Sequence, residues 1–131
     1  MIVLDTHAWV WLLADRARLS RPARTAIDAA LAEEAVAVSS ISCWEVAQLA
    51  KKGRLEFTLP ADEWLAKATA LPVFTFVPVD NQIAVESVAL PASVGDDPAD
   101  RFIVATARAL GAALVTRDKG LRRSGQVTCV W

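Results

Sequence analysis

Four acidic residues stand where a group of carboxylates could do chemistry. Asp5 ends an apolar run, Glu45 interrupts an apolar stretch, Asp100 follows Asp97-Pro98, and Asp118 comes soon after an apolar run near the C-terminus. Carboxylates that gather without a counter-charge repel one another, and their pKa values rise. Mg²⁺ or Mn²⁺ relieves that repulsion, because hard cations prefer oxygen ligands. Such a set indicates metal-supported hydrolysis of phosphodiester bonds.

Each acid taken alone also has a structural interpretation. Asp5 could cap a helix, Asp100 could favour the dipole in the first turn of a helix, and Asp118 could lie in a turn. Glu45 is harder to explain in this way, because its neighbours are apolar and no basic residue lies within one helical turn of it. A glutamate is rarely buried unless it is paired. The residues by themselves leave both interpretations open.

Short apolar runs alternate with helical patterns along the chain. The predicted strands are Met1–Leu4, Ala35–Val38, Val73–Val77, Ala112–Thr116 and Val127–Val130. The predicted helices are Thr6–Ala14, a helix capped by Ser20 and running to about Glu34, Ser40–Lys52, Asp62–Leu71, a helix capped by Asp80 and running to about Ala89, and Pro98–Leu110. This alternation predicts an α/β fold, a parallel sheet covered by helices on both faces.

The predicted elements place the four acids near one edge of that sheet. Ligands of parallel α/β sheets bind beyond the carboxyl ends of the strands. Asp5 and Asp118 follow predicted strands, and Glu45 lies in the opening turns of the helix after the second strand. Asp100 opens a helix whose N-terminus can point to the same edge. We therefore expect the four carboxylates to meet.

The composition fits one domain over residues 1–131, with more apolar residues than usual. The hydrophobic fraction is 54%, against about 45–50% in ordinary domains. Trp9, Trp11, Leu12 and Leu13 surround more than one face of the predicted first helix, so we expect that helix to be buried in the core or beneath a partner. The net charge of −1 does not indicate a nucleic-acid binder. Bases outnumber acids, however, once the four acids are set aside.

Other site types and compartments are disfavoured. Cys43 and Cys129 have no metal-type spacing, and the single His7 cannot complete a zinc site. We expect both cysteines to be reduced core residues of a cytoplasmic protein. The N-terminus lacks a basic region, and Asp5 interrupts its apolar run, so a signal peptide is not expected. No uncharged apolar stretch reaches about 18 residues, so no membrane association is expected.

Four strings of the sequence together resemble one family. They are IVLDTHAWVWLL, SSISCWEVAQLAKKGRL, DPADRFIVATA and LVTRD, in that order. Their order and spacing, and the length of the chain, resemble PIN-domain proteins, in particular the VapC toxins of bacterial VapBC toxin–antitoxin modules. The resemblance covers essentially the whole chain. It implies a three-layer α/β/α fold around a parallel sheet, and an endoribonuclease that depends on Mg²⁺ or Mn²⁺.

The resemblance also assigns roles to single residues. The family's acidic quartet, which is catalytic and binds metal, matches Asp5, Glu45, Asp100 and Asp118. Thr116 matches a supporting hydroxyl residue often found beside the last acid. A cognate antitoxin and a homodimer are implied as partners.

The surroundings of the quartet agree less closely with the family. Relatives commonly carry a basic residue ahead of Asp-Pro and a large apolar residue between Pro and Asp, whereas Gly95-Asp96 and Ala99 occupy those places here. Arg117 and Lys119 flank the last acid. We expect them to contact RNA phosphates, with a merely solvated surface as the alternative.

Other functions could also use these acids or the same fold. A structure-specific DNA nuclease would share the carboxylate–metal chemistry, although the small size favours RNA. A phosphatase with an aspartyl nucleophile would carry Asp-x-Asp after the first strand, where His7 stands instead. A receiver domain would carry neighbouring acids where Asp5 stands alone. A catalytically silent interaction domain is the non-enzyme alternative, although it would gain nothing from unpaired acids. For His7 we favour a structural hydrogen bond over a catalytic base.

Overall fold

The computed structural model describes residues 1–131 and contains one five-stranded parallel sheet. Its strands are β1 (Ile2–Leu4), β2 (Val36–Ser39), β3 (Phe74–Val77), β4 (Ala113–Val115) and β5 (Cys129–Val130). They lie in the order β3-β2-β1-β4-β5, and each neighbouring pair is parallel. The first strand of the chain is therefore central, and Leu4 pairs with Val38 on one side and with Val115 on the other.

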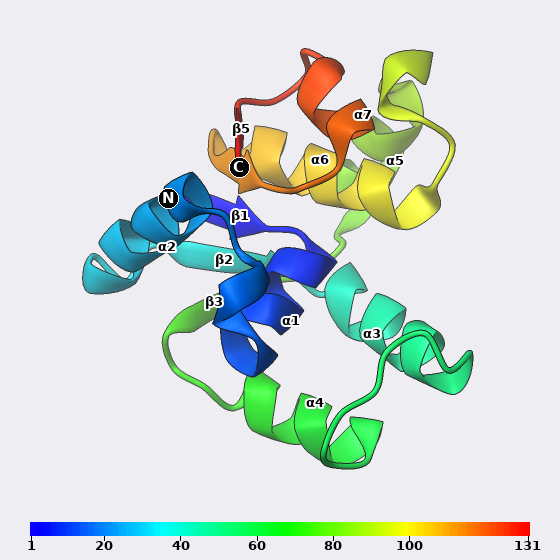
Figure 1. The fold of residues 1–131 in the computed structure, drawn as a ribbon. Helices are drawn as coiled ribbons and strands as arrows, with labels where there is room; N and C mark the ends of the chain where they lie inside the picture. The colour runs from blue at the N-terminus through cyan, green and yellow to red at the C-terminus, as the bar shows by residue number, and fades with distance from the viewer.

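Helices cover both faces of the sheet. They are α1 (Thr6–Ala14), α2 (Arg21–Ala32), α3 (Ile41–Lys51), α4 (Ala61–Thr69), α5 (Asn81–Ala89), α6 (Pro98–Leu110) and α7 (Lys119–Arg123), with short 3₁₀ turns η1 (Arg16–Arg18) and η2 (Ala92–Val94). Figure 1 shows α5, α6 and α7 on one side of the sheet and α1, α3 and α4 on the other. This arrangement confirms the predicted three-layer α/β/α fold.

Side chains that alternate along the strands build two cores. In β1, Leu4 faces the core beneath α1 to α4, whereas Val3 faces the core beneath α6 and α7. In β2, Val36 and Val38 join the first core and Ala37 joins the second. Successive residues of a strand point to opposite faces, so a strand covered on both faces must be apolar throughout. This requirement explains the uninterrupted apolar runs of the sequence.

The Trp-rich first helix is buried in the core of this chain. Trp9 is completely buried, and its ring packs edge-on against Trp64 at 5.3 Å between centroids. Trp11 and Leu12 are buried as well, and Leu13 alone is partly exposed. The core thus accounts for the all-round apolar pattern of α1, so that pattern gives no support to a partner on this helix.

The predicted elements agree with the structure to within a few residues at each end, but one helix was missed. The segment Lys119–Arg123 forms α7, although Asp118 had been interpreted as a possible turn residue. The segment is short, basic and interrupted by Gly120, so it lacks the apolar periodicity that predicts a helix. Its one buried side chain, Leu121, joins the core beneath α6 and α7.

Two further expectations from the sequence concern the state of the cysteines and the absence of a helix that could span a membrane. Both cysteines are free, and each is partly buried. Cys43 packs against the core beneath α1 to α4 and Cys129 against the opposite core, so the two thiols lie on different faces of the sheet. None of the helices combines the length and apolar composition that crossing a bilayer requires.

Arg101 ties three segments together beside the start of α6. Its guanidinium group donates hydrogen bonds to the carbonyls of Ser87 (3.0 Å), Val88 (3.3 Å) and Leu90 at the end of α5. It also donates to the carbonyl of Gly95 at 2.6 Å, after η2. A cation at a helix C-terminus satisfies carbonyls that have no partner within the helix and complements the helix dipole. Arg101 thereby fixes the loop that leads into α6.

We predict that Arg101→Ala lowers the free energy of unfolding by about 2–4 kcal/mol, because several hydrogen bonds to a charged donor are lost together. Urea unfolding monitored by fluorescence measures the change. Arg108→Ala is the matched control, since this exposed arginine donates one bond, to the Gln126 carbonyl at 2.6 Å. Equal losses of unfolding free energy for the two variants would contradict the role of Arg101 in fixing the loop that leads into α6.

Candidate active site

The four predicted acids meet in one cleft of about 710 Å³ at the carboxyl ends of β1 and β4. Its lining residues are Asp5, Thr6, His7, Trp11, Glu45, Asp97, Asp100, Arg117, Asp118, Lys119 and Gly120. Strands β1 and β4 are neighbours, but α1 packs on one face of the sheet and α7 on the other. The cleft therefore lies where the connections diverge, which is the usual ligand site of such sheets.

Asp5 and Asp118 act as helix caps and line the cleft at the same time. Asp5 Oδ1 accepts the backbone N–H of Ala8 at 2.8 Å, and Asp118 Oδ1 accepts that of Leu121 at 2.9 Å. These bonds begin α1 and α7. The structural role expected for Asp5, a helix cap, is therefore confirmed, whereas Asp118 begins a helix and does not lie in the turn considered from the sequence. Each cap fixes the direction in which a carboxylate faces the cleft.

Asp97 and Asp100 play different structural parts at the start of α6. Asp97 Oδ1 accepts the N–H of Asp100 at 3.0 Å and begins α6, with Pro98 in the first turn. The carboxylate of Asp100 does not return a bond to the N–H of Asp97, so the two acids do not form a reciprocal capping box. The side chain of Asp100 is left free to face the cleft.

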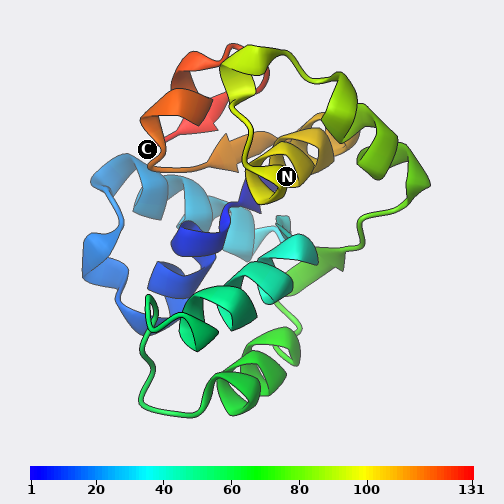
Figure 2. The same cartoon turned by 90° about the vertical axis from the view of Figure 1, so that its right-hand side faces the viewer.

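Glu45 reaches the cleft from α3, which lies beside α1 (Figure 2). A buried hydrogen bond of 2.9 Å, donated by the Thr6 hydroxyl to Ser42 Oγ, joins the first turns of these two helices. Ser42 precedes Glu45 by one helical turn, and Thr6 follows Asp5. The pair of hydroxyls therefore sets the position of Glu45 relative to Asp5.

Thr116 lies between two of the acids. It is fully buried, and its hydroxyl accepts the N–H of Asp118 at 3.1 Å. The same side chain forms a hydrogen bond with Asp5 that lowers the pKa of that carboxyl. The Thr116 side chain thus interacts with residues that follow β1 and β4, and its role as a supporting residue of the site stays a prediction.

Burial and mutual repulsion shape the electrostatics of the cleft. Burial, and after it the neighbouring charges of Asp97, Glu45, Asp118 and Asp5, raise the pKa of Asp100 from 3.8 to about 7. Burial also raises the pKa of Asp5, and bonds from Thr116 and Ala8 oppose the shift. Carboxyls whose pKa values are raised by burial and by neighbouring charges in a cleft, as those of Asp100 and Asp5 are, are a feature of functional sites.

The chemistry of the donors fits a hard divalent cation. Every acidic side chain of the cleft offers oxygen, and the charges that raise the pKa of Asp100 are those that a cation would offset. As the side chains stand, no three of them approach closely enough to hold one ion directly. Mg²⁺ commonly keeps several waters and takes only one or two carboxylates directly, so the donor set suits it without a closed cage.

Basic and aromatic side chains complete the lining. Arg117 and Lys119, both exposed, border the cleft, and their expected contact with RNA phosphates stays a prediction. His7 also lines it, but its ring forms no hydrogen bond and instead lies 5.5 Å from the Trp11 ring, so the structural hydrogen bond expected for His7 was wrong. Trp11 was missed, because a tryptophan in an apolar helix pattern is indistinguishable from a core residue. The mostly buried Trp11 reaches both the core and the cleft.

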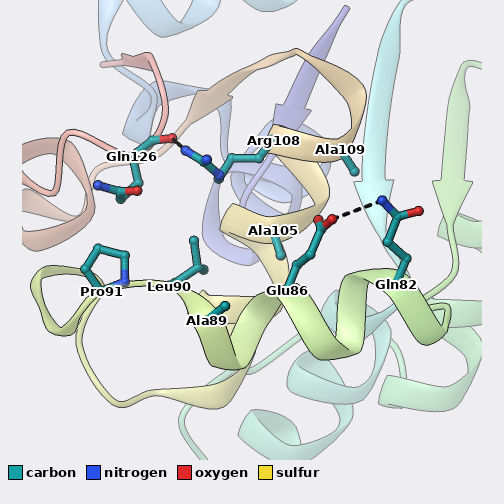
Figure 3. A pocket seen from close by; sticks show the side chains of 9 residues that line it. All are labelled: Gln82, Glu86, Ala89, Leu90, Pro91, Ala105, Arg108, Ala109 and Gln126. Carbon is teal, nitrogen blue, oxygen red and sulfur yellow. Dashed lines mark hydrogen bonds between the residues drawn. The ribbon is translucent and has the colours of Figure 1, made fainter.

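A second cavity, of about 540 Å³, lies between α5 and α6 and has a different character (Figure 3). Its polar groups already bond to one another. Gln82 donates to Glu86 at 3.0 Å, and Arg108 donates to the carbonyl of Gln126. With Glu86 as its single acid, this cavity offers no comparable ligand set, so the acidic cleft is the candidate active site.

Comparison with known proteins identifies the family to which the chain is similar. Residues 2–126 match the PIN domain family. The chain is 40% identical over 132 residues to Ribonuclease VapC22 of Mycobacterium tuberculosis (strain ATCC 25618 / H37Rv), an alignment that covers 99% of this chain and 98% of that protein.

Solved structures of low sequence identity share the fold. VapBC2 from Rickettsia felis, bound to a DNA fragment from their promoter, matches with a TM-score of 0.69 at 17% identity, covering 98% of this chain and 97% of that one. A toxin–antitoxin complex from Klebsiella pneumoniae matches with a TM-score of 0.63 at 22% identity, covering 98% and 96%. At these identities the likeness is one of fold.

The raised pKa of Asp100 predicts a pH-dependent stability in the absence of metal. Between 3.8 and about 7 the unfolded chain has released this proton while the folded chain retains it. The free energy of unfolding should therefore fall as pH rises through that window and level off above it. Asp100→Asn should flatten the slope, so the variant gains stability relative to the wild type as pH rises.

Urea unfolding in chelator across that pH window measures the effect. Asp15→Asn is the control, because Asp15 is exposed and lies outside the cleft. A slope that is the same in Asp100→Asn and in the wild type would show that the raised pKa of Asp100 does not set the pH dependence of stability.

Proposed function

Because the chain belongs to the PIN-domain family, we propose that it is a divalent-metal-dependent endoribonuclease and the toxin of a toxin–antitoxin pair. The meeting of Asp5, Glu45, Asp100 and Asp118 in one cleft is the observation that carries the proposal. The 40% identity to a ribonuclease along nearly the whole chain supports RNA as the substrate. Residues 1–131 act as one catalytic domain in this proposal.

The four acids would hold Mg²⁺ or Mn²⁺. When bound, such a cation supplies the positive charge that activates water and stabilises the phosphoryl oxygens during phosphodiester hydrolysis. The chain positions the ligands: helix caps orient Asp5 and Asp118, and Thr116 bonds to both. The hydroxyl pair between α1 and α3 sets Glu45.

The basic lining residues would bind the substrate. Arg117 and Lys119 are exposed at the cleft, where they can contact phosphates on either side of the cut. Their charge also lessens the repulsion between the RNA backbone and a cleft lined by five acids. A DNA nuclease of the same fold and a silent interaction domain remain as outcomes that the experiment below separates.

Exposed apolar side chains support protein partners. Trp44 on α3 is 54% exposed, next in sequence to Glu45, and Val85 and Val88 on α5 are 72% and 80% exposed. We propose that an antitoxin covers apolar helix surface and blocks the cleft, and that the chain forms a homodimer. An RNA substrate and two free thiols support a cytoplasmic site of action.

The purified protein should cut single-stranded or looped RNA with Mg²⁺ or Mn²⁺, and EDTA should abolish the cleavage. Asp100→Asn should remain folded and lose activity by orders of magnitude, because a metal ligand is lost. Asp97→Ala should cost about 1 kcal/mol of stability as a lost helix cap and keep most of the activity. Gel analysis of RNA cleavage and thermal melting at one Mg²⁺ concentration measure both.

Three results would contradict this proposal in different ways. Full cleavage in excess EDTA would rule out the metal. Preferential cutting of duplex DNA would favour the rival nuclease. An inactive Asp97→Ala beside an active Asp100→Asn would reverse the roles assigned to the two acids.

Expression of the protein alone should arrest growth, and co-expression of the neighbouring open reading frame should restore it, because the antitoxin covers the cleft. Colony counts and co-purification measure the pair. Asp100→Asn is the control and should be harmless with or without the neighbour. Growth that is unaffected by the wild-type protein would contradict the toxin role while leaving the nuclease chemistry to the cleavage assay.

A further inference from the structure

We propose that Arg18 and Arg117, both stacked on the indole of Trp11, form a binding site for the phosphate backbone of the RNA strand beside the acidic cleft. The inference rests on the proposed ribonuclease function and adds to it the path along which the strand runs. Arg18 is new to the site, and Trp11, which lines the cleft, gains a role in it.

The geometry is that of two cation–π contacts on one ring. The guanidinium carbon of Arg18 lies 4.8 Å from the centroid of the Trp11 ring, and that of Arg117 lies 5.8 Å from it. Arginine over tryptophan within about 6 Å is a favourable arrangement. Arg18 comes from η1, Trp11 from α1 and Arg117 from the segment after β4. Three parts of the chain thus bring two positive groups to one ring.

Trp11 is a rigid base for these arginines. It is 7% exposed, and the remainder of its side chain packs in the core beneath α1 to α4. The rings of His7 and Trp131 lie 5.5 Å and 5.9 Å from it. Because the indole cannot move freely, a guanidinium that stacks on it loses mobility before any ligand arrives. Trp11 is therefore a positioning residue for the arginines.

The hydrogen-bond donors of both arginines are free. The one ion pair of the structure joins Arg16 to Asp28, and Arg101 and Arg108 donate to backbone carbonyls. Neither Arg18 nor Arg117 has an ion-pair partner, and both are exposed. A planar guanidinium that is held by stacking while its donors are free is suited to phosphate oxygens.

Electrostatics favour RNA as the occupant. The cleft is lined by five acids and by two basic side chains, Arg117 and Lys119, so a polyanion needs additional positive charge nearby. Arg18 supplies it at the next position outward, since it contacts Trp11, which lines the cleft, without lining the cleft itself. Positive surface then runs from the segment after β4 across Trp11 to η1, and the strand follows it.

Steady-state cleavage of a single-stranded RNA by the full chain, at fixed Mg²⁺ and varied KCl, tests the site. At about 0.1 M salt, loss of one phosphate contact to a single strand weakens binding on the order of fivefold and lowers the salt slope by roughly 0.7. We expect Arg18→Ala to raise KM by that factor with kcat unchanged. Arg24→Ala, which removes an exposed, unpaired arginine of α2, should leave KM, kcat and the slope as in the wild type.

A double-mutant cycle tests the role of Trp11. Trp11→Phe keeps an aromatic side chain in the core but weakens the stacking surface. Arg18→Ala should raise KM less in the Trp11→Phe background than in the wild type, because the arginine is no longer held. General damage to the fold would not produce this coupling, and melting temperatures identify any such damage.

The outcomes separate the site from the function. If the wild type cuts RNA and Arg18→Ala behaves like Arg24→Ala, the phosphate site is overturned and the nuclease stands. If Arg18→Ala weakens binding of the co-expressed antitoxin and leaves RNA cleavage unchanged, the surface is a protein contact and the site is likewise overturned. If the wild type cuts no RNA with Mg²⁺, the proposed function fails and the phosphate site fails with it.

Discussion

Repulsion between like-charged carboxylates is the constraint that the rest of this structure must accommodate. Asp5, Glu45, Asp97, Asp100 and Asp118 line one cleft, and their mutual repulsion, after burial, raises the pKa of Asp100 to about 7. Helix N-termini offset part of the cost, because α1, α6 and α7 each begin at an aspartate that accepts a backbone N–H. The same bonds that begin the helices fix the orientation of these three aspartates.

The order of the strands makes this meeting of helix ends possible. With β1 central, the segments after β1 and β4 leave adjacent strands toward opposite faces of the sheet. The short parallel strands are covered on both faces, and two separate cores hold the helices against them. Packing energy from these cores therefore keeps the charged residues close at the strand ends, where they would otherwise drive the helices apart.

Polar side chains away from the acids give the cleft its stiffness. The Thr6–Ser42 hydrogen bond joins α1 to α3, Thr116 connects Asp5 and Asp118, and Arg101 fixes the loop that leads into α6. Each of these contacts acts on the backbone that carries an acid. A site of this kind needs ligands whose directions are set before a cation or substrate arrives, since aligning them during binding would cost entropy.

Local signals in the sequence were enough for most of the fold. Apolar runs predicted the five strands, and the start of α6 was readable from Asp97-Pro98, because strand and helix periodicities and caps depend on neighbours in sequence. The quartet was found from strand ends and from the family resemblance.

Tertiary structure decided what depends on contacts between distant residues. Helix α7 is short and basic, and the sequence did not predict it. Its one buried residue, Leu121, packs into a core that only the tertiary structure forms. The Trp-rich first helix read equally as core or as partner surface, and packing decided for the core. The contacts of Arg18 and Arg117 with Trp11 could not be predicted from the spacing of these residues in the sequence, since three separate segments supply them. The pKa of Asp100 likewise follows from burial and from distances between charges, which exist only once the chain has folded.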